Sequence, residues 1–115
     1  MKLQDFLDRL EQRADIIDFN DTMSVIDNMY HFTPSAFKNG ALYNAADQNN
    51  GSCKLFAFAK LHGLDEQQTL ACFGRYYRDD VLNNPHGTDH RNIRNFMHSG
   101  WSGIEFDGTP LQAKP

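Results

Sequence analysis

The sequence contains no long apolar segment and no excess of positive charge. No apolar run approaches the roughly 18 residues of a membrane-spanning helix, and the first residues, with charges at helical spacing, lack the apolar stretch of a signal peptide. The 11 Lys and Arg residues are scattered and are outnumbered by 15 Asp and Glu. Because nucleic acids and anionic membranes are bound through clustered cations, we expect neither as a partner.

Cysteine is also scarce, since Cys53 and Cys72 are the only two. A chain of 115 residues can build a core without a disulfide, so we expect free thiols in a reducing cytoplasm. Two histidines, His86 and His90, could form a zinc site with one cysteine. Closed zinc sites usually have ligands in closely spaced pairs, and the cysteines are not paired in this way, so we expect no metal and no cofactor.

Hydrophobic residues make up 40% of the chain and include nine Phe, which is enough for one well-packed core. They recur at helical spacing in several segments, for example at Leu3, Phe6, Leu7 and Leu10. We predict one domain over residues 1–115. Its class is α+β, mainly α, with about five helices around a central buried helix near residues 53–62.

Helix starts are predicted from polar residues that can accept a hydrogen bond from a first-turn N–H group. The predicted N-caps are Asn20, Ser52, and either Thr88 or Asp89, and a capping box of Asp65 and Gln68 opens the fourth helix. Gly74 is expected to break or kink that helix. The polar residues of the fifth helix, which include Arg91, Asn92, Arg94 and Asn95, are expected to form an exposed face.

Helical spacing is absent between Phe32 and Gly51. Asn39-Gly40 is a strong signal for a tight hairpin turn, so we predict a small β-hairpin near residues 32–44. The alternation of Ile104 and Phe106 predicts one further short strand.

Five strings of residues together resemble the HopJ-type type III effector family over roughly residues 15–108. They are Phe19-Asn-Asp-Thr-Met, Tyr30-His-Phe-Thr-Pro-Ser-Ala-Phe, Asn49-Asn-Gly-Ser-Cys-Lys-Leu-Phe-Ala-Phe-Ala, Tyr76-Tyr-Arg-Asp-Asp-Val-Leu and Gly87-Thr-Asp-His-Arg-Asn-Ile-Arg-Asn-Phe-Met. The resemblance implies a bacterial protein that stays in the cytoplasm or, as a true effector, is secreted into a host cell and contributes to virulence. It supplies no catalytic residues.

A cysteine-dependent hydrolase or deamidase is one functional hypothesis. Cys53 is expected in the first turn of a helix, where the helix dipole stabilises a thiolate. Such enzymes pair the nucleophile with a histidine and an orienting polar group. The candidates are Cys53 as nucleophile, His90 or else His86 as base, Asp89 or Asn92 as orienting group, and Asn49 or Asn50 at the oxyanion. The commoner role of a single cysteine is that of a small core residue.

A protein-interaction module without catalytic activity is the second hypothesis, and the one we favour. Amphipathic aromatic residues are enriched at recognition surfaces, and the candidates for such a surface are Tyr76, Tyr77, Trp101, His98 and Tyr43. They are also common at the edge of a core. The partner would be a protein that the sequence does not identify.

Asp79 and Asp80 are expected to be solvated charges at a helix end.

Overall fold

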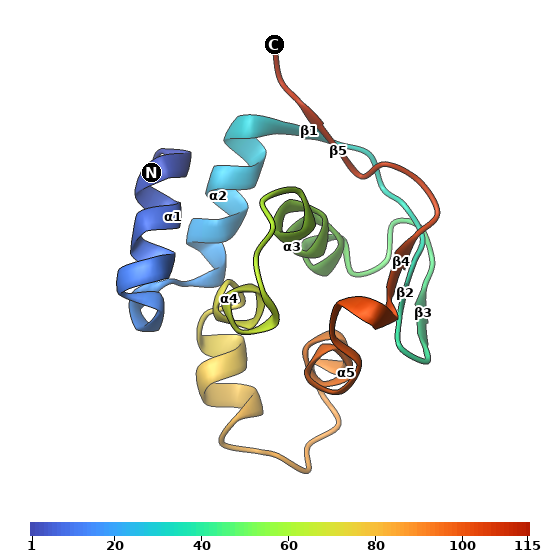
Figure 1. Cartoon of the computed structure of the whole chain (residues 1–115). Helices are drawn as coiled ribbons and strands as arrows, with labels where there is room; N and C mark the ends of the chain where they lie inside the picture. Colours follow the sequence, from blue (N-terminus) through green and yellow to red (C-terminus); the bar gives the residue numbers. More distant parts are fainter.

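One buried helix lies at the centre of the computed structural model, which describes all 115 residues (Figure 1). This helix, α3 (Asn50–Leu61), has six buried residues: Cys53, Leu55, Phe56, Ala57, Phe58 and Ala59. The other helices are α1 (Leu3–Gln12), α2 (Phe19–Met29), α4 (Glu66–Ala71) and α5 (Arg91–Ser99), with 3-10 turns at Ala14–Ile16 and Gly100–Gly103 and a π-helical segment at Tyr76–Val81. The predicted α+β class and the central helix are confirmed.

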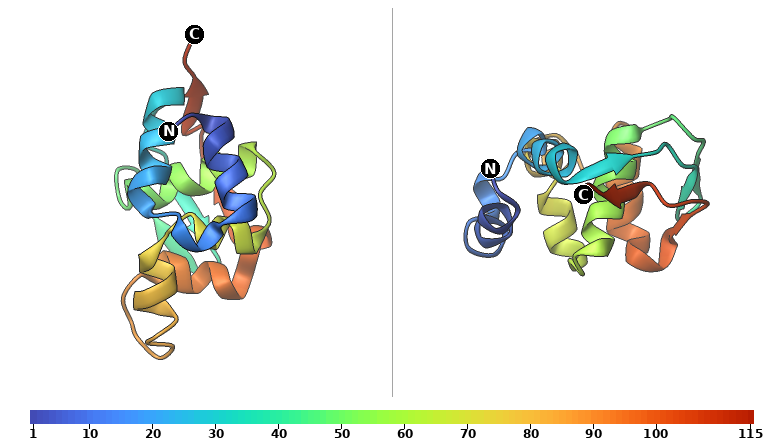
Figure 2. Two further views of the ribbon diagram at one scale, coloured as in Figure 1. Left: turned by 90° about the vertical axis from the view of Figure 1, so that its left-hand side faces the viewer. Right: turned by 90° about the horizontal axis from the view of Figure 1, so that it is seen from above.

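The N-terminal helices form a layer on one side of α3. α1 lies outermost and α2 lies between it and α3 (Figures 1 and 2). Phe6 and Leu10 of α1 are buried, as the helical spacing of apolar residues predicts, and the ring of Phe6 meets that of Phe58 edge-to-face at 5.8 Å. None of the helices combines the length and apolar composition that crossing a bilayer requires.

The opposite side of α3 is covered by short strands. They are β1 (Tyr30–Phe32), β2 (Phe37–Asn39), β3 (Leu42–Asn44), β4 (Ile104–Phe106) and β5 (Leu111–Ala113). β2 and β3 form the predicted hairpin, with the turn at Gly40. Phe32 lies outside that hairpin, because β1 pairs with β5 while β4 pairs with β2. The segments 30–39 and 104–113 therefore run antiparallel to each other and pair at two places, β1 with β5 and β2 with β4.

The helix caps only partly follow the predictions. The capping box of Asp65 and Gln68 is confirmed, but the other predicted N-caps are wrong. The observed ones are Asp18 for α2, Asn49 for α3 and His90 for α5. Asn49 and His90 adopt left-handed backbone conformations, with φ of 53° and 49°, and their side chains bond to Asn44 and Asp80 instead of to the helix start. The capping rule considers only side chains that bond to the first turn of their own helix.

Gly74 ends the helical run that begins with α4, as predicted, because its φ is +63°. A Cβ atom built there would lie 2.7 Å from backbone atoms of both Asp18 and Phe19. The close approach brings the start of α2 against the chain between α4 and the π-helical segment.

We expect Gly74→Ala to destabilise the protein by about 2 to 5 kcal/mol, since it combines left-handed strain with a clash against backbone. Gly63→Ala is the matched control, because Gly63 has the same φ of +63° but nothing within 4 Å of the added Cβ. That control should cost only about 1 to 2 kcal/mol. Urea unfolding measures both, and equal losses would contradict the packing explanation.

Candidate functional site

A cavity of about 500 Å³ lies where the first turns of α3 and α5 meet. Apolar side chains of Phe19, Phe73 and Ile93 line part of its wall. The polar part of the wall includes Asn49 and Ser52 at the start of α3, and His90, Arg91 and Asn92 at the start of α5. The first N–H groups of a helix have no partner within the helix, so the cavity combines apolar surface with main-chain and side-chain polar groups.

A buried network of asparagine side chains holds the two helix starts together. Asn44 and Asn92 exchange two amide hydrogen bonds, at 3.1 Å and 3.0 Å. Asn49 Nδ2 donates to Asn44 Oδ1 at 2.7 Å, and Asn39 Nδ2 donates to Asn92 Oδ1 at 3.0 Å. Asn39, Asn44 and Asn92 are at most 6% exposed. Buried amides of this kind cost stability when they are unpaired, and within the network only Asn39 Oδ1 has no partner. The other hydrogen bonds tie the hairpin to both helices.

The expectation that Asn92 lies on an exposed face of the fifth helix is therefore wrong. The hairpin packs against that side of α5 and supplies hydrogen-bond partners for Asn92. Arg94 is also largely covered, with only 13% of its side chain exposed. Spacing along a helix identifies a polar face, but it does not show whether another polar segment covers that face.

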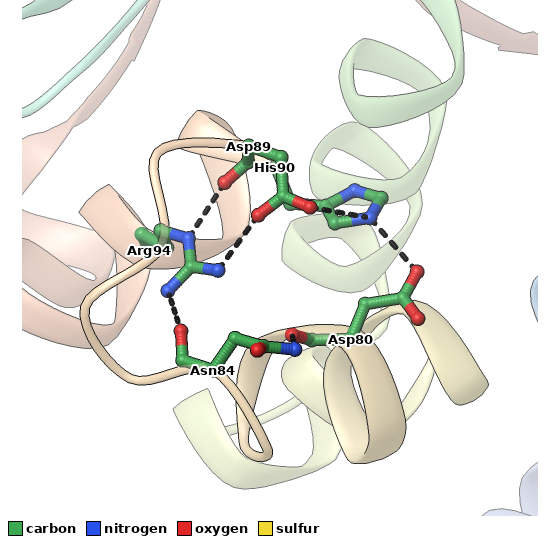
Figure 3. A network of polar contacts seen from close by, with 5 residues as sticks. All are labelled: Asp80, Asn84, Asp89, His90 and Arg94. Carbon is green, nitrogen blue, oxygen red and sulfur yellow. Dashed lines mark hydrogen bonds and ion pairs between the residues drawn. The ribbon is translucent and has the colours of Figure 1, made fainter.

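His90 stands at the rim of the cavity and is held on two sides. Its Nε2 lies 3.0 Å from Asp80 Oδ2 and 4.0 Å from Asp89 Oδ2 (Figure 3). Its ring stacks on that of Tyr76, with centroids 5.3 Å apart and planes inclined by 30°. Asp80, expected to be a solvated charge, thus orients the imidazole. Left-handed backbone at a non-glycine residue is strained and tends to occur at functional positions. The left-handed conformation of His90 therefore supports a functional role for the rim of the cavity.

Arg94 organises the loop before α5. Its guanidinium donates to the carbonyl and carboxylate of Asp89, at 2.6 Å and 2.7 Å, and to the carbonyl of Asn84 at 2.7 Å (Figure 3). The hydrogen bond from Arg94 is the main reason that the pKa of Asp89 is lowered. These contacts fix the loop that carries Asp89 and His90 against the cavity.

Cys53 is placed as a core residue. It is 1% exposed, and its Sγ lies 3.6 Å from the carbonyl oxygen of Ser35. Burial raises the pKa of the Cys53 thiol, the opposite of what a nucleophile needs. Its neighbours Gly51 and Ser52 line the cavity, whereas Cys53 does not. No hydrogen bond joins Cys53 to His90, so the structure does not bring the predicted dyad together.

The structure brings only some of the other predicted residues together. Asp89, His90 and Tyr76 share the cavity wall. Asn50 donates a hydrogen bond to Asp47, and His86 and His98 are exposed. Tyr77 and Trp101 line two other cavities, and Trp101 Nε1 donates to the carbonyl of Leu64 at 2.9 Å. No cluster of metal-ligating side chains is present.

Sequence reasoning missed Asn39 and Asn44 as members of the site. Both belong to the predicted hairpin, where asparagine is explained by its preference for turns. A better signal would have been the number of asparagines flanking the hairpin and the starts of α3 and α5. Phe19 was missed as well: Gly51 allows its ring to approach, since a Cβ there would lie 2.7 Å from Phe19 Cζ.

The model of the HopJ type III effector protein family matches residues 3–111 of this chain. The chain belongs to that family. A solved structure with the same fold is the crystal structure of VPA0580, a protein of unknown function. The two sequences are 56% identical, and the match covers 99% of this chain and 95% of that chain. The two structures superpose with a TM-score of 0.97. No curated protein matches this HopJ-family chain.

Loss of the asparagine network should be costly in this HopJ-family protein. We expect Asn92→Ala to reduce the free energy of unfolding by about 1 to 3 kcal/mol, because it removes the three side-chain hydrogen bonds that Asn92 makes with Asn39 and Asn44 in a buried site. Asn83, an exposed residue whose side chain makes no hydrogen bond, is the control; Asn83→Ala should stay within about 0.5 kcal/mol. If urea unfolding gave similar values for both variants, the network would not be a main support of the fold.

Thiol reactivity provides a separate test of the catalytic hypothesis. In a Cys72→Ser variant we expect iodoacetamide to label Cys53 slowly between pH 7 and 9, because the thiol is buried and its pKa is raised. Labelling should accelerate only when urea unfolds the protein. Fast labelling of the native protein with a midpoint below about 8.5, the value for a free thiol, would instead indicate an activated cysteine.

Proposed function

We propose that this HopJ-family protein is a protein-interaction module, and that the cavity between the starts of α3 and α5 receives a side chain of its partner. The observation that carries the proposal is the composition of the wall of this cavity. Phe19, Phe73 and Ile93 supply apolar surface, while Asn49 and Arg91 supply polar groups beside them. Recognition sites typically combine an apolar pocket with a few well-placed polar groups.

The preorganised shape of the cavity supports a binding role for its wall. The asparagine network and the contacts of Arg94 hold the cavity in one conformation, which lowers the conformational entropy that a partner must remove on binding. Tyr76 is 40% exposed and stacks on His90, so an aromatic surface is available at the rim. Because the family is named for type III effectors, a protein of a host cell is one candidate partner.

The alternative, a cysteine-dependent hydrolase or deamidase that uses Cys53 and His90, has less physical support. A thiol that is buried and hydrogen-bonded to the carbonyl of Ser35 is stabilised in its protonated form. The α3 start would have to rearrange before Sγ reached a substrate in the cavity.

Photo-cross-linking tests the binding proposal. Replacing Tyr76 with the photoreactive residue benzoylphenylalanine places the probe at the rim of the cavity, and we expect a discrete covalent adduct with one protein in the cells that produce the chain or in host cells. The control carries the probe at Tyr43, which is 58% exposed but outside the cavity wall.

A blocking variant ties the adduct to the cavity. Thr88 is exposed and lines the cavity, so Thr88→Trp should obstruct it without disturbing the core, and the adduct at position 76 should fall by at least about tenfold, the equivalent of 1.4 kcal/mol. Adducts that are equal at positions 76 and 43, or that Thr88→Trp leaves unchanged, would refute the proposal.

A further inference from the structure

The imidazole of His90 is held in one orientation by acidic side chains. Its Nε2 lies 3.0 Å from Asp80 Oδ2 and 4.0 Å from Asp89 Oδ2 (Figure 3). An ionised carboxylate can only accept a hydrogen bond, so Nε2 carries the proton that is donated to Asp80. In the neutral ring the other nitrogen, Nδ1, therefore has a free lone pair, and it makes no hydrogen bond within the protein.

The ring that carries this lone pair borders open space. His90 lines the cavity of about 500 Å³ between the starts of α3 and α5, and 28% of its side chain is exposed. Asp80 and Tyr76, which contact the ring, both belong to the π-helical segment Tyr76–Val81. Single π-helical turns are rare and occur frequently at functional sites. A histidine paired with a carboxylate beside a cavity is typical of proton-transfer sites.

The same cavity wall offers hydrogen-bond donors to a carbonyl oxygen. No side chain caps the first turn of α3, because the amide of Asn49 bonds to Asn44 instead. The N–H groups of Gly51 and Ser52 consequently have no hydrogen-bond partner, and both residues line the cavity. Unpaired main-chain N–H groups at a helix start can stabilise the negative charge that develops on a carbonyl oxygen under attack.

We propose that His90 acts as a general base at this cavity and activates water for the hydrolysis of a bound ester or amide. The inference goes beyond the proposed binding function and does not use Cys53. The water oxygen forms a bond to the acyl carbon while Nδ1 takes a proton from the water, and a carbonyl electron pair moves onto the carbonyl oxygen. The tetrahedral intermediate then collapses: the bond to the alcohol or amine breaks, and Nδ1 gives its proton to this leaving group. The products are a carboxylic acid and an alcohol or amine, and His90 is neutral again.

Asp80 is a positioning residue in this reaction. The ring becomes positively charged when Nδ1 accepts the proton, and a carboxylate on the opposite nitrogen stabilises that charge. Asp80 bonds directly to Nε2, and Asp89 adds a second carboxylate at 4.0 Å. The hydrogen bond from Arg94 lowers the pKa of Asp89, which keeps its carboxylate ionised at neutral pH. Both carboxylates therefore favour proton transfer to His90.

Hydrolysis of p-nitrophenyl acetate by the full chain tests the inference. We expect the chain to exceed an equal concentration of free imidazole by at least about a hundredfold, a typical contribution of a positioned general base. His90→Asn should remove this excess, and asparagine is chosen because it tolerates the left-handed backbone at this position. His31→Gln is the control, because His31 is exposed and outside the cavity, and it should react as the unmodified chain does.

Two further measurements identify the proton transfer. Attack by water with His90 as general base should be slower in heavy water, because a proton moves in the transition state. Asp80→Asn should reduce the rate by at least about tenfold, because the asparagine amide can donate to Nε2 and so move the ring proton to Nδ1. ¹⁵N NMR of labelled histidine reports this change of tautomer, and an unchanged tautomer with an unchanged rate would contradict the role of Asp80.

Three results would overturn the inference. They are a rate no higher than that of free imidazole, a rate that His90→Asn leaves unchanged, and equal rates in light and heavy water. Cross-linking at Tyr76 measures only whether a partner binds. Binding without hydrolysis would therefore overturn this inference and leave the proposed function standing, whereas hydrolysis without a cross-linked partner would support this inference and contradict the proposed function.

Discussion

The reciprocal pair of side-chain amides on Asn44 and Asn92 is the interaction on which the arrangement of this protein depends. It joins β3 to α5, and Asn49 and Asn39 extend it to the start of α3 and to β2. Amide groups buried this deeply would destabilise the fold if any partner moved away. The hairpin and the two helix starts are therefore held in one relative position, and the cavity between them keeps its shape.

A row of aromatic rings connects that cavity to the core. Phe73 and Phe19 stack at 6.2 Å, Phe19 meets Tyr76 at 5.4 Å, and Tyr76 stacks on His90. The row begins among buried side chains and ends at the exposed rim. Rings packed in this way have little rotational freedom, so the rim owes its order to the core, while the Asp80 carboxylate holds the last ring in place.

Pairing between distant segments closes the other side of the molecule. Segments 30–39 and 104–113 are about seventy positions apart in sequence, yet strands from both segments pair in each of the two small sheets. The C-terminal segment thereby covers the side of α3 opposite α1 and α2 (Figure 2). In the two-stranded sheet, β5 has β1 as its only neighbouring strand.

Periodic apolar residues predicted the helices and the central position of α3, and the Asn39-Gly40 pair predicted the hairpin, because these signals lie within a few residues of each other. The turn itself is at Gly40-Ala41, since Asn39 pairs with Leu42. The family could also be named from the sequence. The cap residues Asn49 and His90, the burial of Asn92 and the pairing of His90 with Asp80 depended on the tertiary structure. In each case the deciding hydrogen bond reaches a segment that is distant in sequence or lies across a loop, and a polar residue carries no local sign of whether water or a buried amide will be its partner.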